Sequence, residues 1–389
     1  MTSKPARPLA ELAGLFLKLG TISFGGPAAH TALMEAEVVR RRKWLTHQEF
    51  LDLVGATNLI PGPNSTELAI HIGLRRAGWP GLIIAGACFI LPAMLIVTVI
   101  AWAYVRFGKL PEANTLLYGV KPVIIAVVVQ ALWNLGKSAV KTKLLAAVGI
   151  IAAAACFSGV NELLVLFGCG FALLAFRAAD KNKPAAQGGF APLFANVPGA
   201  SATIATTATA TAVVAPFSLN LMFFFFLKVG AVLFGSGYVL LAFLRADLVE
   251  RWHWLTESQL LDAIAVGQFT PGPVFTTATF IGYLLSGPAG ALIATVGIFL
   301  PAFLFVALSA PLIPRLRASP LAGAFLDGVN VASLALMAVV TWQLGASALV
   351  DWLTLGLAVM AATVLLRWKI NSAWLVLGGA GVGLLKAWL

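Results

Sequence analysis

Charged residues are scarce in this chain. Only 11% of its 389 residues are Asp, Glu, Lys or Arg, whereas 60% are hydrophobic and the mean hydropathy is +0.93. Because soluble domains carry about 25% charged residues, the composition excludes an ordinary soluble protein. It indicates a polytopic membrane protein, whose first partner is the lipid bilayer.

Cysteine and histidine are scarce as well. The three cysteines lie singly within apolar runs, at Cys88, Cys156 and Cys169. An odd and scattered set is typical of packing residues and disfavours disulfides. The four histidines form no metal-ligand cluster, so the sequence predicts neither a metal nor another cofactor.

The motifs of common enzymes are absent too. The chain has no convincing Ser/His/Asp arrangement and no phosphate loop of the Gly-x4-Gly-Lys kind, so we expect no enzyme. Its net charge of +11 is a feature shared with nucleic-acid-binding proteins. In a membrane protein, however, Lys and Arg first mark the cytoplasmic loops. We therefore expect no nucleic-acid partner, and an anionic ligand is the second interpretation of the charge.

Apolar runs close to the ~20 residues that span a bilayer recur along the whole chain. They are continuous and lack the alternation of an outer-membrane barrel. Together with the broken segments described below, they predict roughly ten to twelve membrane elements, all of them helical. The runs are 81–104, 116–133, 144–157, 163–176, 219–234, 289–312, 326–344, 353–366 and 373–385.

The chain also repeats itself. Phe16 returns as Phe226 within a shared Phe-Leu-Lys segment, an offset of 210 (226 − 16), and Trp44-Leu45-Thr46 returns as Trp254-Leu255-Thr256. Further along, Leu91 matches Leu300 within Leu-Pro-Ala, an offset of 209 (300 − 91). We predict two homologous halves, 1–177 and 217–389, joined by a linker over 178–216.

The loop charges differ between these halves. Arg40 to Lys43 precede Trp44, whereas the matching loop holds Asp247, Glu250 and Arg251. Under the positive-inside rule, an alternating charge bias predicts an inverted-topology repeat. The predicted fold is therefore an all-α polytopic membrane protein with two homologous helical halves, inverted relative to each other and containing broken or re-entrant helices.

Each half contains a polar break inside an apolar run. The first break is Pro61-Gly62-Pro63 and the second is Pro271-Gly272-Pro273. Proline and glycine end helices, so we expect the first helix to stop at Ile60 and the next to start at Pro63. Irregular backbone at membrane depth is tolerated only where it is buried or lines a cavity. Two copies favour a binding site over a simple kink.

The residues after the breaks predict an anion site. A helix that starts at Pro63 leaves amides without intrahelical partners and points the positive end of its dipole into the gap. Broken helices bind anions in this way, and a tetrahedral oxyanion accepts many such hydrogen bonds. The first copy adds the side chains of Asn64, Ser65 and Thr66, and the second offers Thr270, Thr276, Thr277 and Thr279.

Several ionisable residues lie inside apolar helices, where they are functional candidates by default. Lys18 and Lys228 occupy matching places and either contact the anion or extend to the interface. Asp52 and Asp262 also match, and either neutralises a cation or carries a proton. Glu67 and His71 are four apart and share one helix face, as a proton relay, a gate or a solvated pair. Their counterparts are Thr277 and Ile281.

These residues resemble the chromate ion transporter family in its long, two-domain form. The resemblance rests on Phe24-Gly25-Gly26-Pro27 with Ala28-Ala29-His30, on Trp44-Leu45-Thr46, on 61–66, and on 271–273 with Thr276 and Thr277. It covers nearly the whole chain apart from the linker, and it adds Gly25 and Gly26 to the predicted site. Ser236 and Gly237 replace the second glycine and the proline, and Asn-Ser is missing from the second break, so we expect two unequal halves.

The resemblance implies a secondary transporter that exports chromate across the bacterial cytoplasmic (inner) membrane and confers resistance. Export of a dianion runs down the membrane potential, with or without proton coupling. A proton-coupled importer of sulfate or another oxyanion and an anion channel remain alternatives. The expected partners are a chromate or sulfate-like oxyanion and the bilayer, and a homo-oligomer stays open.

Overall fold

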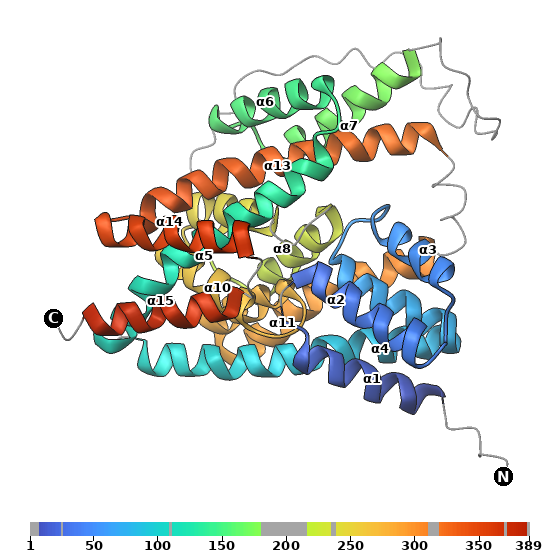
Figure 1. Cartoon of the computed structure of the whole chain (residues 1–389), viewed down its shortest axis with the longest axis horizontal. Helices are drawn as coiled ribbons and strands as arrows, with labels where there is room; N and C mark the ends of the chain where they lie inside the picture. The colour runs from blue at the N-terminus through green and yellow to red at the C-terminus, as the bar shows by residue number, and fades with distance from the viewer. Residues whose placement is uncertain are drawn as a thin grey trace.

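The computed structural model describes residues 8–24, 26–108, 111–179, 216–234, 239–309, 319–368 and 372–386, and all regular elements there are helices (Figure 1). Gly25 and almost all of the predicted linker lie outside the described residues. The first half contains α1 (Pro8–Ile22), α2 (Gly26–Glu35), η1 (Ala36–Arg41), α3 (His47–Thr57), α4 (Asn64–Phe107), α5 (Pro111–Ala139), α6 (Lys143–Phe157) and α7 (Glu162–Ala179).

The second half repeats this order of elements. It contains α8 (Leu219–Val232), α9 (Leu240–Leu244), η3 (Arg245–Arg251), α10 (Glu257–Phe269), η4 (Val274–Thr276), α11 (Thr277–Ser309), α13 (Pro320–Ala348), α14 (Trp352–Trp368) and α15 (Ser372–Lys386). The repeat therefore extends from single residues to whole helices, which confirms the predicted all-α fold with two homologous halves.

Local sequence signals start the same helix in both halves. Thr46 caps α3 by accepting a hydrogen bond from the Glu49 amide, while the Glu49 side chain accepts from the Thr46 amide. Thr256 and Gln259 form the same capping box at α10. Such boxes satisfy two donors that a helix start otherwise leaves free.

The long helices α4 and α11 each reverse direction at a glycine. Gly78 has φ 62° and ψ −151°, and Gly287 has φ 61° and ψ −151°. A Cβ added to Gly73 would lie 2.2 Å from the carbonyl oxygen of Gly81. Eight residues of straight helix would instead span about 12 Å. Each element is therefore a hairpin of a short helix followed by a long one.

Five helices are long and apolar enough to cross a membrane, and four shorter helices are also apolar. Two of the five, 64–107 and 274–309, contain the hairpins, so the number of long helices does not equal the number of membrane crossings. The chain is a multi-pass membrane protein. The number of crossings and the inversion of the halves stay predictions.

The halves exchange their C-terminal helices. In Figure 1, α6 and α7 of the first half lie along α13 of the second, and α15 lies along α5, in agreement with the helix contacts. Glycines allow this close approach. A Cβ on Gly119 would lie 1.9 Å from the Gly379 carbonyl oxygen, and one on Gly328 would lie 2.5 Å from that of Cys169. Such reciprocal contacts indicate an approximate two-fold relation between the halves.

Candidate functional site

The two predicted breaks interrupt helices as expected. α3 ends at Thr57 and α4 begins at Asn64, so the first break starts three residues earlier than the predicted stop at Ile60. In the second half, α10 ends at Phe269 and one 3₁₀ turn precedes α11. The helix start after Pro63 is confirmed, and Pro63 itself takes an extended conformation.

Each Pro-Gly-Pro break contacts a break in the other half. The Gly62 amide donates to the Leu233 carbonyl oxygen at 2.7 Å, and the Gly272 amide donates to that of Ser23 at 2.9 Å. Ser23 and Leu233 are matching residues (233 − 23 = 210), and each follows the first helix of its half. The two hydrogen bonds are therefore equivalent under the repeat. Each joins a Pro-Gly-Pro break of one half to the break after the first helix of the other half.

The breaks lie halfway along the long helices. A Cβ on Gly272 would lie 2.7 Å from the Ala93 Cβ, and one on Gly62 would lie 3.7 Å from the matching Ala302. Ala93 is fourteen residues from Trp79 (93 − 79) and fourteen from Phe107 (107 − 93), the ends of its straight segment. Secondary transporters bind substrate at such a depth, between repeats.

Polar side chains follow the first break into the protein interior. Ser65, Thr66, Glu67 and His71 are all buried, with at most 4% of each residue exposed. Thr66 Oγ1, both Glu67 carboxyl oxygens and His71 Nε2 find no hydrogen-bond partner among the described residues. The Glu67 carboxyl folds back toward the break, since a Cβ on Gly62 would lie 2.3 Å from its Oε1. Asn64 instead donates to the Asn58 side chain at 2.9 Å.

The second break has satisfied side chains. Thr276 Oγ1 donates to the Pro273 carbonyl oxygen at 2.8 Å, and Thr277 Oγ1 donates to that of Val274 at 2.9 Å. Thr270 bonds the Val266 carbonyl oxygen in the same way. Thr279 shares a hydrogen bond with Thr295 at 2.7 Å. These hydroxyls still accept hydrogen bonds, but each already donates to the protein or pairs within it.

One histidine takes part in the pairing of the breaks. His30 Nε2 lies 3.1 Å from the same Ser23 carbonyl oxygen that accepts from Gly272. The ring is buried against Phe89, and Nδ1 has no partner among the described residues. The first-half motif quoted for the resemblance contains His30, although sequence reasoning gave it no role in a site.

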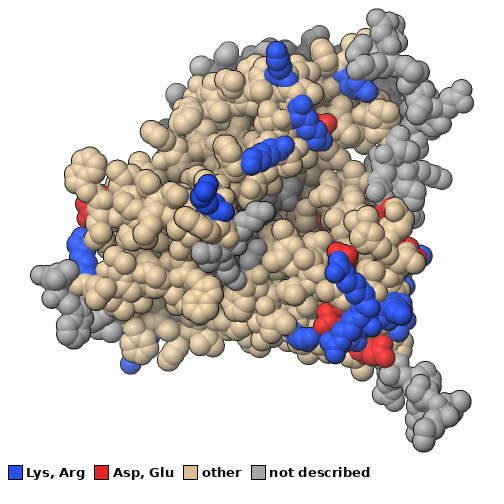
Figure 2. Space-filling model, in the orientation of Figure 1, with Lys and Arg blue, Asp and Glu red and all other residues tan. Residues whose placement is uncertain are grey.

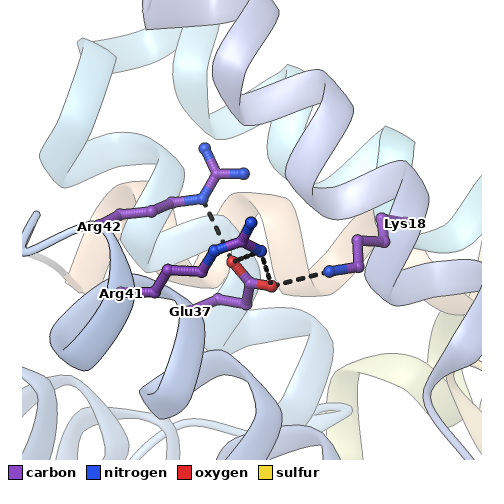
Figure 3. Close-up of polar contacts among 4 residues, drawn as sticks. All are labelled: Lys18, Glu37, Arg41 and Arg42. Atoms are coloured by element: carbon purple, nitrogen blue, oxygen red, sulfur yellow. Dashed lines mark hydrogen bonds and ion pairs between the residues drawn. The ribbon is translucent and has the colours of Figure 1, made fainter.

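The two matching lysines are bound by matching carboxylates. Lys18 Nζ lies 2.9 Å from Glu37 Oε1, and Lys228 Nζ lies 2.5 Å from Asp247 Oδ2. Arg41 and Arg42 also reach Glu37, as Figure 3 shows, and Arg251 bonds Asp247. Glu37 lies outside the candidate spans, and the hydrogen bond from Lys18 is the main cause that lowers its pKa.

The charged loops are thus duplicated more closely than the sequence suggested. Glu37 matches Asp247 and Arg41 matches Arg251, so the two lysine sites share one design. Two residues before each carboxylate the signs reverse, because Glu35 binds Arg40 and His47, whereas Arg245 binds Glu250 and Glu257. In Figure 2, basic and acidic side chains gather near the α1 end of the visible face, and separate basic side chains lie across its upper part. A residue-by-residue comparison at the 210-residue offset would have shown that Glu37 matches Asp247 and Arg41 matches Arg251.

The two matching aspartates have different surroundings. Asp52 is half-buried and accepts from Gln48 at 3.4 Å. Asp262 is buried, accepts from the Tyr104 hydroxyl at 2.8 Å, and pairs with Lys121 at 3.4 Å. Lys121 was missed by sequence reasoning, although a single cation inside the apolar run 116–133 was a visible signal.

Comparison with known proteins agrees with this architecture. The family model described as Chromate transporter matches residues 10–174 and 220–384, one match per half. The chain is 34% identical over 383 residues to the chromate transport protein of Cupriavidus metallidurans, covering 98% of this chain and 94% of that protein. It is 31% identical to the probable chromate transport protein of Synechococcus elongatus, with 95% and 92% covered.

A shorter relative matches part of the chain. The uncharacterised transporter YwrA of Bacillus subtilis is 31% identical over 126 residues, which cover 32% of this chain and 71% of that protein. No solved structure matches the chain. The relatives are named for transport and the family model covers both halves, so this chain belongs to the chromate transporter family.

Proposed function

We propose that this protein is a secondary transporter that exports chromate across the bacterial cytoplasmic membrane and thereby confers chromate resistance. The observation that carries the proposal is the reciprocal hydrogen bonding of the four breaks, Gly62 to Leu233 and Gly272 to Ser23. It brings irregular backbone from both halves to the middle of the long helices. Family membership supports chromate as the substrate.

The first break supplies the proposed binding groups. Helix α4 starts there with Ser65 and Thr66 buried in its first turn, so their hydroxyls and the helix dipole favour an anion. The Thr66 amide, expected to be without a partner, instead donates to the Pro63 carbonyl oxygen at 2.8 Å. Gly62 and Gly272 allow the backbone to approach the ion closely. We assign Pro61, Pro63, Pro271 and Pro273 the role of holding the breaks open, because proline removes a donor and stops the helix.

Glu67 is the proposed proton-coupling group of this site. An ionised carboxylate beside the break repels a dianion, whereas a protonated one donates a hydrogen bond to it. His71 lies one turn further along the same helix and is the next proton acceptor. Asp52 and Asp262 remain candidates for the same role on the helices that enter the breaks. The membrane potential favours export of a bare dianion by about twice 2.3 kcal/mol per 100 mV. A proton that leaves together with the dianion lowers the exported charge from two to one, and the potential still favours export by about 2.3 kcal/mol per 100 mV.

Lys18 and Lys228 have a different proposed part. Each forms an ion pair with a carboxylate of the π-helical turn in its own half, Lys18 with Glu37 of η1 and Lys228 with Asp247 of η3. An oxyanion reaches either lysine only by competing with that carboxylate. We therefore propose that the two lysines position the breaks, and that the anion is bound by donors of the breaks themselves.

Uptake of radiolabelled chromate into vesicles tests the function. Inside-out vesicles should accumulate chromate, and an interior-positive potential should increase the rate. Saturation and counterflow are expected of a carrier, whereas a channel shows neither. Accumulation of sulfate by right-side-out vesicles with an inward proton gradient, without chromate accumulation by inside-out vesicles, would establish the importer instead.

A further inference from the structure

Lys121 is a cation within an apolar helix at the junction of the two halves. It is followed on α5 by a buried stretch, Val123 to Val128, and 19% of its side chain is exposed. Charged residues in such segments are costly and usually face a partner or a water-filled cavity. Since Lys121 belongs to the first half and its carboxylate partner to the second, the pair joins the elements that a transporter moves relative to each other.

The contacts of Lys121 leave it available for another ligand. Its Nζ donates to Ser258 Oγ at 2.6 Å and lies 3.4 Å from Asp262 Oδ1. This separation is at the limit of hydrogen-bond distance, and Oδ1 has no well-aligned donor among the described residues, so charge contributes most to the pair. The other oxygen, Oδ2, accepts from the Tyr104 hydroxyl at 2.8 Å. An ammonium has three donors, and the described hydrogen bonds use one of them.

The second copy of the fold has no such cation. The position that matches Lys121 is Asn330 (330 − 121 = 209), and Asp52 stands at the place of Asp262. Asp52 is half-buried beside Gln48. A structural ion pair required by the fold would be expected in both halves, as it is for Lys18 with Glu37 and Lys228 with Asp247. The Lys121–Asp262 pair is therefore not duplicated at the matching positions, Asn330 and Asp52.

The cluster also lies on the helices that flank the second break. Asp262 lies on α10, seven residues before the helix ends at Phe269, which corresponds to about 10 Å along the helix. Tyr104 packs against Phe280 on α11, which leaves the same break, with ring centroids 5.2 Å apart. Ser258 stands at the start of α10, at the end remote from the break. The cluster is thus placed between the paired breaks and one end of the helix bundle.

We propose that Lys121 is a second anion-binding group, at which the transported oxyanion displaces Asp262. The inference rests on the proposed function, because it takes the transported ion to be a tetrahedral oxyanion. Such an ion accepts hydrogen bonds from the Lys121 ammonium, the Ser258 hydroxyl and the Tyr104 hydroxyl once Asp262 has moved away. Without substrate, Asp262 is the counter-ion of Lys121. The positive charge of the Lys121 ammonium becomes available to the oxyanion only when the oxyanion displaces the Asp262 carboxylate.

Transport kinetics of three variants test the exchange. Lys121→Gln should raise the KM for chromate at least tenfold in vesicles. Asp262→Asn removes the competitor and should lower the KM, whatever it does to the maximal rate. The double variant should behave like Lys121→Gln. A structural pair predicts the opposite pattern, in which both single variants fail alike and the double variant recovers, and that pattern would overturn the proposal.

A matched ion pair provides the control. Lys141, two residues after the end of α5, pairs with Asp327 of α13 at 2.9 Å, also between the halves, but both side chains are exposed, by 61% and 37%. Lys141→Gln and Asp327→Asn should leave the KM within twofold of wild type. Protein amount and melting temperature of every variant are measured in parallel, so that a loss of folding is not counted as a loss of binding.

Ligand-dependent stabilisation separates this inference from the proposed function. Purified wild-type protein should be stabilised against heat by chromate and by sulfate more than by chloride, and Lys121→Gln should lose most of that increment. If wild type transports no chromate, but sulfate stabilises it and Lys121→Gln loses that increment, the proposed substrate fails and the Lys121 site stands. If the increment is unchanged in Lys121→Gln, the site fails and the proposed function stands.

Discussion

The two Pro-Gly-Pro breaks make the same backbone hydrogen bond, but they differ in whether the polar side chains that follow them have hydrogen-bond partners. Both donate a glycine amide to a carbonyl of the other half. After the first break, Thr66, Glu67 and His71 have buried polar atoms without partners among the described residues. After the second, Thr276 and Thr277 donate to local carbonyls. Because an unpaired buried polar group is costly, its retention indicates a ligand or a proton, whereas a satisfied group contributes to stability.

The largest expected difference between the breaks is at Glu67. Glu67→Ala should lower the initial rate of chromate transport roughly 10- to 100-fold, because a hydrogen bond from a charged or proton-sharing group is worth about 1.5–3 kcal/mol. Thr277→Ala, at the matching place, should lower it less than threefold. Rates are compared in vesicles at equal protein amounts. Equal losses in the two variants would contradict a functional difference between the breaks.

The two glycines should separate function from stability. In Gly272→Ala the new Cβ meets Ala93 at 2.7 Å in a backbone with φ +92°, so we expect the larger fall in melting temperature, for about 1–3 kcal/mol of added strain. Gly62→Ala is strained as well, since φ is +140°, but its Cβ meets the movable Glu67 carboxyl, so we expect a smaller fall in melting temperature than in Gly272→Ala and a larger fall in transport. Thermal unfolding and transport are measured on both variants. The reverse order would show that Glu67 is held rigidly.

The hydroxyls give a smaller contrast of the same kind. Thr276→Val should cost about 1 kcal/mol of stability, because it removes a hydroxyl that donates to the Pro273 carbonyl oxygen. Thr66→Val should cost no stability and should reduce chromate affinity a few-fold. Denaturation midpoints and KM values decide between them. A stability loss in Thr66→Val would mean that its hydroxyl has a structural partner.

The smallest effects are expected at the lysines, where the halves are alike. Lys18→Gln and Lys228→Gln should each reduce transport only two- to threefold. The lowered pKa of Glu37 means that its ionisation stabilises the fold at neutral pH and that this stabilisation disappears as acid protonates the group. The stability gap between wild type and Lys18→Gln should therefore be widest above pH 4.5, the ordinary value, and should close below it. Melting temperatures across pH 3–7 measure the gap, and a constant gap would exclude Glu37 as its cause.

The breaks were predictable from the sequence. They and the capping residues Thr46 and Thr256 are local features with local causes. The burial of Glu67 and His71 was not predictable in this way, because a solvated pair remained an alternative. The partners of Lys18 and Lys228 were not predicted, because the charges of the loops were compared as groups rather than at the 210-residue offset. Lys121 was missed because a single cation in an apolar run does not reveal its partner.

The sequence by itself determined the helices, the two homologous halves and the places where helices break, since proline, glycine and apolar periodicity act over a few residues. Only the tertiary structure decided which breaks meet. The bond from Gly62 to Leu233 spans 171 residues (233 − 62) and joins backbone atoms, which carry no side-chain signature. The same holds for burial without a partner at Glu67, because whether a polar group is satisfied depends on every element packed around it.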